Sequence, residues 1–334
     1  MNDWLVTDLD RELFNRELDS FVPATIFDAH AHWYRADHFP PEGMPGLVKS
    51  GPSVAGSDAF NQFIGQLIPN RPTEGLFFPF PHAQVDVNAA NEFLYHELRR
   101  RPDSRGQMLI TPSQDPEFIR RTVRHFGFVG LKCYHVYSPR RPTFDSLIEE
   151  FLPEQQVRIA QEEGLSITLH IVRPRALADH ANQATIRSYC ERYPEMRLIL
   201  AHAARGFNPH HTMLGIDSLR GLANVWFDTS AVTDSGAIEA IIRTFGHERL
   251  LYGSDFPVSH LRGRCVALGG SFLWISSNNT DLDVPYGKLQ LTLTGLESLR
   301  TLKIAAMSTQ LTDSQVEDVF YRNAARLFGL GTGT

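Results

Sequence analysis

The chain has 334 residues, 42% of them hydrophobic, and its 32 Lys and Arg residues are outnumbered by 38 Asp and Glu residues, for a formal net charge of −6. A chain of this size buries a large core without needing disulfide or metal cross-links. The lack of a basic excess argues against a nucleic-acid partner. No segment approaches the ~18–20 apolar residues needed to cross a bilayer, and the acidic start MNDWLVTDLDRELF lacks the order of a signal peptide. We therefore expect a cytoplasmic protein with no membrane partner.

Apolar residues recur at helical spacing over residues 9–21, which predicts an amphipathic helix in an N-terminal extension of residues 1–24. From residue 25 to residue 334, short β-rich runs alternate with helical patterns, as is typical of βαβ units around a parallel sheet. The predicted strands are 25–29, 75–80, 107–111, 128–134, 166–171, 197–202, 224–229 and 249–254. Eight such units favour an α/β fold of the TIM-barrel type, (β/α)8. A doubly wound open sheet would usually carry a Gly-rich phosphate loop after its first strand, and DAHAHWY is not one.

Three long helical patterns and two insertions complete the predicted barrel domain of residues 25–334. Helices are predicted over 89–101, 144–163 and 313–328, the last closing the chain. An insertion over 33–71, rich in Pro and Gly with weak periodicity, is expected to be a long loop covering the barrel mouth. A second insertion covers residues 266–286 and follows the eighth strand.

Polar side chains end four of the predicted strands. His30 and His32 follow the first strand at an interval of two, so in an extended segment they point to the same side. The runs SITLH, RLILAH and RLLYGSD deliver His170, His202 and Asp255. Because barrel enzymes carry their sites at the carboxyl ends of the strands, we expect these side chains to meet at one mouth. Imidazole and carboxylate ligands without thiolates predict one divalent metal ion, foremost Zn²⁺, with Mn²⁺ or Fe²⁺ as alternatives.

Catalytic roles follow from these residue types. A metal ion there would lower the pKa of a water molecule and polarise the bond under attack. Asp255 could be a ligand and also accept the proton, and His202 could complete the coordination or act as general acid/base. A lone strand-terminal histidine is more often structural. Five such residues on four strands would leave several buried polar groups unpaired, at about a few kcal/mol each, and this favours the functional interpretation.

The segments FDAHAH, ITLH, LILAH, VWFDTSA, LLYGSDFP and RNAARLFGL resemble, in order, the signature stretches of the amidohydrolase-related branch of the amidohydrolase superfamily. That branch includes aminocarboxymuconate-semialdehyde decarboxylase, resorcylate decarboxylase and several lactonases. The resemblance runs from about residue 26 to residue 330. It implies that His30, His32, His170 and Asp255 bind the metal and that His202 is the acid/base beside it.

Lys132, in the segment GLKCYHVY, admits two interpretations. Its place at the end of the fourth strand resembles that of the lysine that is carboxylated and bridges two metals in dihydroorotases and phosphotriesterases. In that case His170 and His202 would bind the second ion, while His30, His32, Asp255 and Lys132 would hold the first, with Lys132 bridging the two. In the simpler case Lys132 is uncarboxylated and binds a substrate anion, and one metal is present, which is the case we favour.

Two arginines are placed to contact a substrate carboxylate. Arg173 lies three residues after His170 and Arg205 three after His202, so both guanidiniums could reach the mouth, although each could equally solvate a loop. Three further candidates to line the pocket are Lys132, His135 and Trp33. Two arginines at the mouth imply that the substrate is a small organic acid, or its lactone or amide.

The sequence favours hydrolysis of a C–O or C–N bond in a small carboxylated substrate. Non-oxidative decarboxylation is the closest alternative, because the same ligand set supports it when the metal binds substrate instead of activating water. A catalytically silent member that only binds a ligand is a further alternative, against which the His202 and Asp255 pair argues. A homo-oligomer is compatible with the sequence, which does not specify one.

Overall fold

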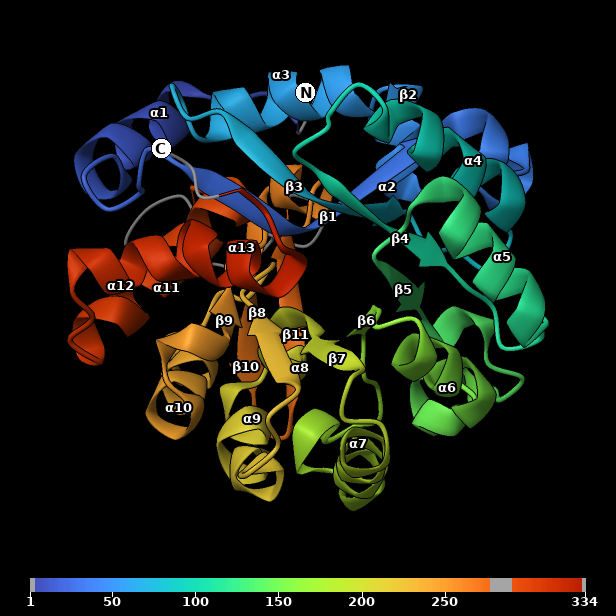
Figure 1. The fold of residues 1–334 in the computed structure, drawn as a ribbon. Helices are drawn as coiled ribbons and strands as arrows, with labels where there is room; N and C mark the ends of the chain where they lie inside the picture. Colours follow the sequence, from blue (N-terminus) through green and yellow to red (C-terminus); the bar gives the residue numbers. More distant parts are fainter. Residues whose placement is uncertain (1–3, 277–289, 332–334) are drawn as a thin grey trace.

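The computed structural model describes residues 4–276 and 290–331, and in it parallel strands curl into a barrel ringed by helices (Figure 1). The main sheet has nine strands, and β2 (Val54–Ala55) pairs antiparallel with the outer end of β1. The parallel strands are β1 (Ile26–Arg35), β3 (Thr73–Pro79), β4 (Arg105–Leu109), β5 (Gly130–Cys133), β6 (Ser166–Leu169), β7 (Arg197–Leu200), β8 (Val225–Asp228) and β9 (Leu250–Leu251). The predicted α/β barrel is confirmed.

The barrel closes where β1 meets the chain that follows β9. The backbone N–H of Asp255 donates to the carbonyl of His30 at 2.8 Å. The carboxylate of Asp28 accepts from the backbone N–H of Ser254 at 2.8 Å and from its hydroxyl. A Cβ atom on Gly253 would lie 2.8 Å from the Cβ of His30, so only glycine allows this close approach. The closure therefore sets Asp255 against the histidines of β1.

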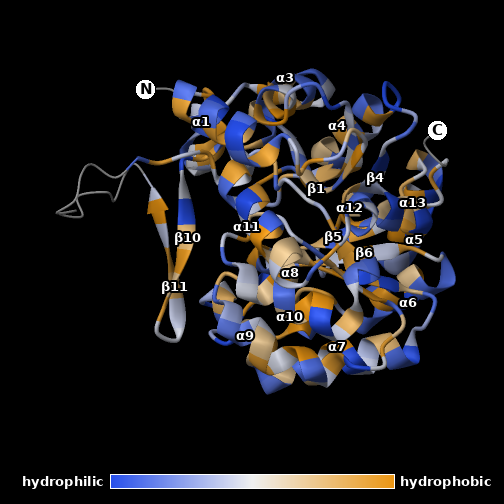
Figure 2. Ribbon diagram, turned by 90° about the vertical axis from the view of Figure 1, so that its left-hand side faces the viewer, coloured by the Kyte–Doolittle hydropathy of each residue, from blue (hydrophilic) through white to orange (hydrophobic). Residues whose placement is uncertain are grey.

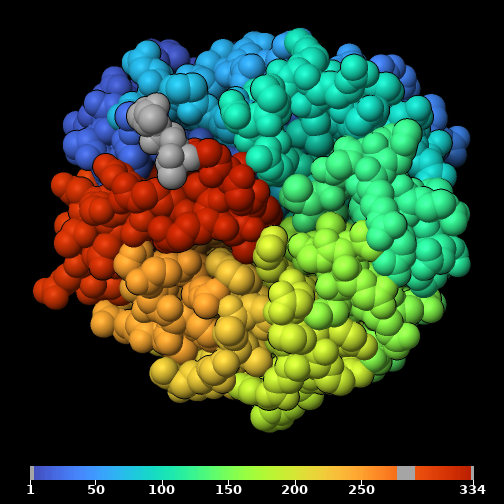
Figure 3. Space-filling model, viewed as in Figure 1, coloured from blue at the N-terminus to red at the C-terminus, as the bar shows by residue number. Residues whose placement is uncertain are grey.

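Apolar side chains fill the end of the barrel where the strands begin. The cluster comprises Phe27, Ala29, Leu76, Phe78, Ile199 and Leu251 of the strands with Ala324, Leu327 and Phe328 of α13 (Asn323–Phe328). The rings of Phe27 and Phe328 lie 5.9 Å apart. Figure 3 shows the C-terminal segment, in red, reaching the centre of this face. This end is closed by packing, so the polar strand ends lie at the other end.

The helices that surround the barrel agree with the sequence in part. They are α4 (Val87–Leu98), α5 (Pro116–Phe126), α6 (Glu154–Glu162), α7 (His180–Arg192), α9 (Pro209–Gly215), α10 (Ser235–Phe245), α11 (Thr294–Ser308) and α12 (Asp313–Glu317), which a π-helical turn joins to α13. The short segment labelled α8 (Ala201–Arg205) is a left-handed turn. The helix predicted over 144–163 is wrong in its first half, where two 3-10 turns precede α6, because Pro153 cannot sit inside a helix. The sequence analysis did not anticipate α11. No helix within 4–276 or 290–331 has the length and apolar character that would let it span a membrane.

The expected loop over 33–71 is largely ordered into short elements. Strand β1 runs on to Arg35 before α2 (Gly46–Ser50) and β2, and α3 (Ser57–Leu67) follows. Phe60 of α3 is fully buried and packs edge-on against Phe77 of β3 at 4.8 Å. The second predicted insertion begins inside a hairpin of β10 (Gly263–Leu268) and β11 (Ser271–Ser276), which lies along one side of the molecule (Figure 2) and packs against it through the rings of Phe207 and Phe272, 5.2 Å apart. Residues 277–286 of that predicted insertion lie outside the described residues.

A buried ion pair fastens the N-terminal helix to the barrel. Helix α1 (Asp8–Leu13) is capped by Thr7, and Asp10 accepts from Arg262 at 2.7 Å and from the backbone N–H of Leu293 at 3.1 Å. Burial alone would raise the pKa of Asp10, but the hydrogen bonds from Arg262 and Thr7 outweigh it and lower that pKa. The first helix is thus held by charge as well as by packing.

Asp10→Asn should lower the free energy of unfolding by about 3–5 kcal/mol at pH 7, because Arg262 would be left buried without its anion. Since the pKa of Asp10 is lower in the folded state, its contribution is present above the unfolded carboxyl pKa and is lost as pH falls through the folded value. Denaturant unfolding between pH 3 and 7 should show a shallower acid dependence in the variant. The exposed Asp8→Asn is the control, and equal stability of Asp10→Asn and wild type would contradict the expectation.

Candidate active site

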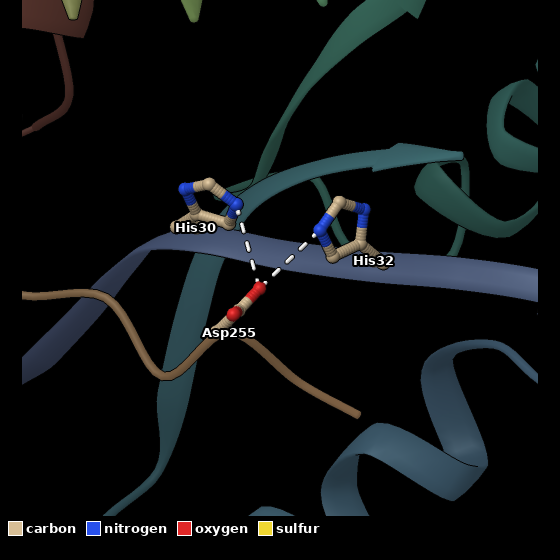
Figure 4. Close-up of side chains that lie close together, drawn as sticks. All are labelled: His30, His32 and Asp255. Carbon is tan, nitrogen blue, oxygen red and sulfur yellow. Dashed lines mark ion pairs between the residues drawn. The ribbon is translucent and has the colours of Figure 1, made fainter. Parts of the chain in front are cut away.

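His30, His32 and Asp255 face one another at the carboxyl end of the barrel (Figure 4). The Nε2 atoms of His30 and His32 lie 3.5 and 3.3 Å from Oδ1 of Asp255, and all three side chains are buried. Burial, and next the nearby charge of Lys132, lower the pKa of both imidazoles. Neutral imidazoles beside a carboxylate are the form that binds a metal ion. The three residues make a buried group that could hold one.

The donor chemistry of this group fits a divalent transition metal. Imidazole nitrogen and carboxylate oxygen suit Zn²⁺, Mn²⁺ or Fe²⁺. In the ranges that the structure describes, His170 is not in the close group, but its ring lies 4.9 Å from that of His202. Its Nδ1 is buried without a hydrogen-bond partner among these residues, and such an atom is costly unless a ligand or water meets it. His170 is thus suited to complete a coordination shell.

His202 and Arg205 stand at the two ends of a left-handed turn. Residues His202, Ala203, Ala204 and Arg205 have φ angles of 56°, 51°, 59° and 57°. This conformation costs L-residues about 1–2 kcal/mol each, and strain of this kind gathers at functional sites. The Nδ1 of His202 lies 2.9 Å from the carbonyl oxygen of Ser230, which can only accept, so Nδ1 carries the proton and Nε2 does not. The turn points both ends into one cavity.

That cavity has a volume of about 360 Å³, and its wall is both ionic and aromatic. Its polar lining comprises His30, His32, Lys132, His170, His202, Arg205 and Asp255, and its aromatic lining comprises Phe80, Tyr134, Phe144, Phe207, Phe272 and Trp274. Phe272 and Trp274 come from the β10–β11 hairpin, so this hairpin forms part of the wall. A pocket of this size suits a small ligand.

Arg205 is buried in the cavity, with 8% of its surface exposed. Its Nη1 donates to the carbonyl of Arg173 at 2.8 Å, and its guanidinium lies 5.5 and 5.3 Å from the ring centroids of Phe144 and Phe272. Across the described ranges it makes no ion pair with a carboxylate. Burial lowers the pKa of Arg205, which is still a cation at neutral pH. A buried arginine without an acidic neighbour is suited to bind an anion.

Lys132 lies in the same cavity and is fully buried. Its Nζ is 3.5 Å from Nε2 of His30 and 4.3 Å from the centroid of the Phe78 ring. Burial lowers the pKa of Lys132 to about 8. The structure therefore brings this lysine beside the histidines of β1.

Three other residues expected at the substrate lie elsewhere. Arg173 is engaged by Asp179, at 2.9 Å from its Nε, and does not line the cavity. Trp33 is in the core, stacked on Phe77 at 3.9 Å, because β1 continues past the mouth and turns this side chain inward. His135 sits behind the wall, with its ring 5.8 Å from that of His170.

The sequence analysis missed several residues of the site. Asp228 ends β8 in the segment VWFD and contacts Nδ1 of His30 at 2.8 Å, so the rule that found the other strand ends could have found it. Phe207 lies in the segment between β7 and α9, and Phe272 and Trp274 lie in the β10–β11 hairpin. None of them ends a strand of the barrel, so the strand-end rule could not have found them.

Residues 27–330 match the family model described as Amidohydrolase. The chain belongs to the amidohydrolase family. No curated protein matches it in sequence.

Three solved structures share this fold at low sequence identity. An amidohydrolase from Burkholderia multivorans with bound Zn has a TM-score of 0.58 and 15% identity, over 92% of this chain and 100% of that one. A 5-carboxyvanillate decarboxylase from Sphingomonas paucimobilis has a TM-score of 0.57 and 13% identity, over 92% and 100%. A probable 2-pyrone-4,6-dicarboxylic acid hydrolase from Acinetobacter baumannii, with citric acid bound, has 0.57 and 14%, over 91% and 99%.

The purified amidohydrolase should contain about one tightly bound divalent metal ion per chain. Replacing both His30 and His32 by Ala should remove it, because each loses a nitrogen that faces Asp255. Elemental analysis of the purified proteins measures this. The matched control is His210→Ala, which removes an exposed imidazole on α9. Undiminished metal in the double variant would show that the ion is bound elsewhere.

Proposed function

We propose that this amidohydrolase is a metal-dependent hydrolase of a small carboxylated substrate, such as a lactone or an amide. The observation that carries the proposal is the composition of one cavity. It combines a His30, His32 and Asp255 group with an adjacent His202 and with the guanidinium of Arg205. The His30, His32 and Asp255 group with His202 suits bond cleavage, and the guanidinium of Arg205 suits the binding of an anion. Their combination favours cleavage in an anionic substrate.

His30, His32, His170 and Asp255 would hold the ion. In the two-metal alternative Lys132 would join His30, His32 and Asp255, and His170 and His202 would bind the second ion. We favour a single ion and zinc, which the Burkholderia structure contains. A divalent ion in this position acts as a Lewis acid, lowering the pKa of water and polarising a carbonyl group. The protein supplies the groups that move protons and hold the substrate.

Asp255 and His202 are the proposed proton carriers. Oδ1 of Asp255 faces the two imidazoles, and Oδ2 lies 3.9 Å from Nδ1 of His202. Burial raises the pKa of Asp255, which makes its carboxylate a stronger base than an exposed one. Burial lowers the pKa of His202, so its imidazole is neutral at pH 7 and can accept a proton at Nε2. One of these two bases would take the proton of water, and that same proton would then be delivered to the leaving atom, either by the group that took it or after passing to the other.

Arg205 is the proposed binding group for the substrate carboxylate. The rings of Phe144 and Phe272 shield its guanidinium from water, and electrostatic attraction is stronger in such surroundings. The Acinetobacter neighbour is a probable hydrolase of a dicarboxylic acid, which is in keeping with a carboxylated substrate. An anion fixed at Arg205 would orient the substrate towards Asp255 and His202, which line the same cavity.

Arg205→Met should raise KM for a carboxylated substrate at least tenfold, because truncating one partner of a buried charge pair costs about 2–5 kcal/mol. Arg173→Met is the matched control. Arg173 is held by Asp179 outside the cavity, so its loss should leave KM unchanged. Steady-state kinetics on the first substrate found in a screen of lactones, amides and aromatic acids measures both. A larger effect at Arg173 than at Arg205 would reverse the assignment.

The reaction type is tested by turnover of that substrate in ¹⁸O-labelled water. Hydrolysis transfers one oxygen from water to the product, so mass spectrometry should find label in the newly formed carboxylate. Decarboxylation uses the same cavity differently, with His202 protonating the carbon that loses carbon dioxide. The Sphingomonas neighbour is a decarboxylase of this fold. Unlabelled product with release of carbon dioxide would therefore overturn the proposed hydrolysis.

A further inference from the structure

Asp228 is fully buried at the end of β8 and joins the two halves of the site. Its Oδ2 lies 2.8 Å from Nδ1 of His30. Its Oδ1 accepts from the backbone N–H of His202 at 2.9 Å, from the backbone N–H of Ser230 at 3.1 Å, and from the Ser230 hydroxyl. One carboxylate thus contacts a histidine of β1 and the first residue of the left-handed turn.

The chemistry of these contacts fixes the proton on His30. Two backbone N–H groups can only donate, and the Ser230 hydroxyl donates to the same oxygen. Three donors on one oxygen stabilise the ionised form of Asp228, and the other oxygen, Oδ2, is then a carboxylate oxygen that can only accept from Nδ1 of His30. Nδ1 of His30 must therefore carry the proton, and Nε2 is left with its lone pair. That Nε2 is the nitrogen that faces Asp255.

We propose that Asp228 is a positioning residue that selects the metal-binding tautomer of His30 and, through the same carboxylate, anchors the turn that carries His202 and Arg205. A carboxylate behind a ligating imidazole fixes the orientation and raises the basicity of that imidazole. The inference rests on the proposed role of His30 as a metal ligand, and it is independent of whether the reaction is hydrolysis.

The anchoring half of the proposal follows from the strain of the turn. Four successive residues in the left-handed region need contacts that hold them there. The bond from the N–H of His202 to Asp228 fixes the start of the turn, and Thr212 donates its hydroxyl to the carbonyl of Ala203 at 2.8 Å further along. Losing the first contact should therefore disturb the placement of Arg205 as well as the imidazole of His30.

Asp228→Asn and Asp228→Ala separate positioning from packing. In the Asn variant the single amide oxygen satisfies the larger number of donors when it faces His202 and Ser230, which turns the amide NH₂ toward Nδ1 of His30. Nδ1 must then accept, and its proton moves to Nε2. The Ala variant leaves the imidazole free to adopt either tautomer. Asparagine, although it has the shape of aspartate, should therefore impair zinc binding at least as much as alanine does.

Zinc affinity is measured by competition with a chromophoric chelator for wild type and both variants, after circular dichroism shows that each is folded. We expect affinity to fall about 10–100-fold in Asp228→Ala and at least as far in Asp228→Asn. Asp10→Asn is the control. It removes a buried carboxylate that pairs with Arg262 and does not line the cavity, so it should keep wild-type zinc affinity. Wild-type affinity in Asp228→Asn, or a clearly milder loss than in Asp228→Ala, would overturn the inference.

A measurement on the wild-type protein decides the matter even where a variant fails to fold. Histidine ¹⁵N NMR of the metal-free protein, with the His30 signals assigned by their loss in His30→Gln, should show Nδ1 protonated and Nε2 unprotonated. The opposite tautomer would overturn the inference. Wild-type protein that takes up no zinc would instead contradict the proposed function, and the NMR result would still decide the tautomer.

Discussion

The site depends on the closure of the barrel between its first and last strands. Asp28 and Ser254, 226 residues apart in the chain, are joined by two hydrogen bonds, and the backbone of Asp255 is bonded to that of His30. A sheet of eight tilted strands has unpaired edges until these ends meet, so closure stabilises the fold as a whole. The same closure sets a carboxylate opposite two imidazoles. The stability of the fold and the arrangement of the proposed metal-binding side chains therefore depend on the same contacts.

The fold also supports backbone conformations that are unfavourable in isolation. His202 to Arg205 lie in the left-handed region, and so does Asp255, with φ of 58°. Such residues persist only where surrounding contacts fix them. Here those contacts come from Asp228 and the carbonyl of Ser230, which hold His202, and from the carbonyl of His30, which accepts from the backbone N–H of Asp255. Three of these residues, His202, Arg205 and Asp255, line the cavity, as expected of a functional site.

Much of the site could be predicted from the sequence, because the rules involved are local. A side-chain period of two in strands puts His30 and His32 on one side, and the apolar runs before His170, His202 and Asp255 mark them as strand ends. The barrel followed from the same alternation. Helix 144–163 was overpredicted because apolar spacing outweighed the presence of Pro153.

Contacts between distant segments could not be predicted in this way. Arg173 and Arg205 both stand three residues after a strand-end histidine, and only tertiary structure separates them. Asp179 binds the first, whereas the left-handed turn directs the second into the cavity. The aromatic wall from the β10–β11 hairpin depends on how that hairpin folds back, which no local period encodes.

The central claim is that the closure builds a metal site from His30, His32 and Asp255, and anomalous diffraction from a zinc-soaked crystal tests it most directly. The account predicts an anomalous peak at the zinc edge within coordination distance, about 2.0–2.2 Å, of Nε2 of His30, Nε2 of His32 and a carboxylate oxygen of Asp255. A peak on the Nδ1 side of His30, beside Asp228, or a peak only at surface histidines, would contradict it.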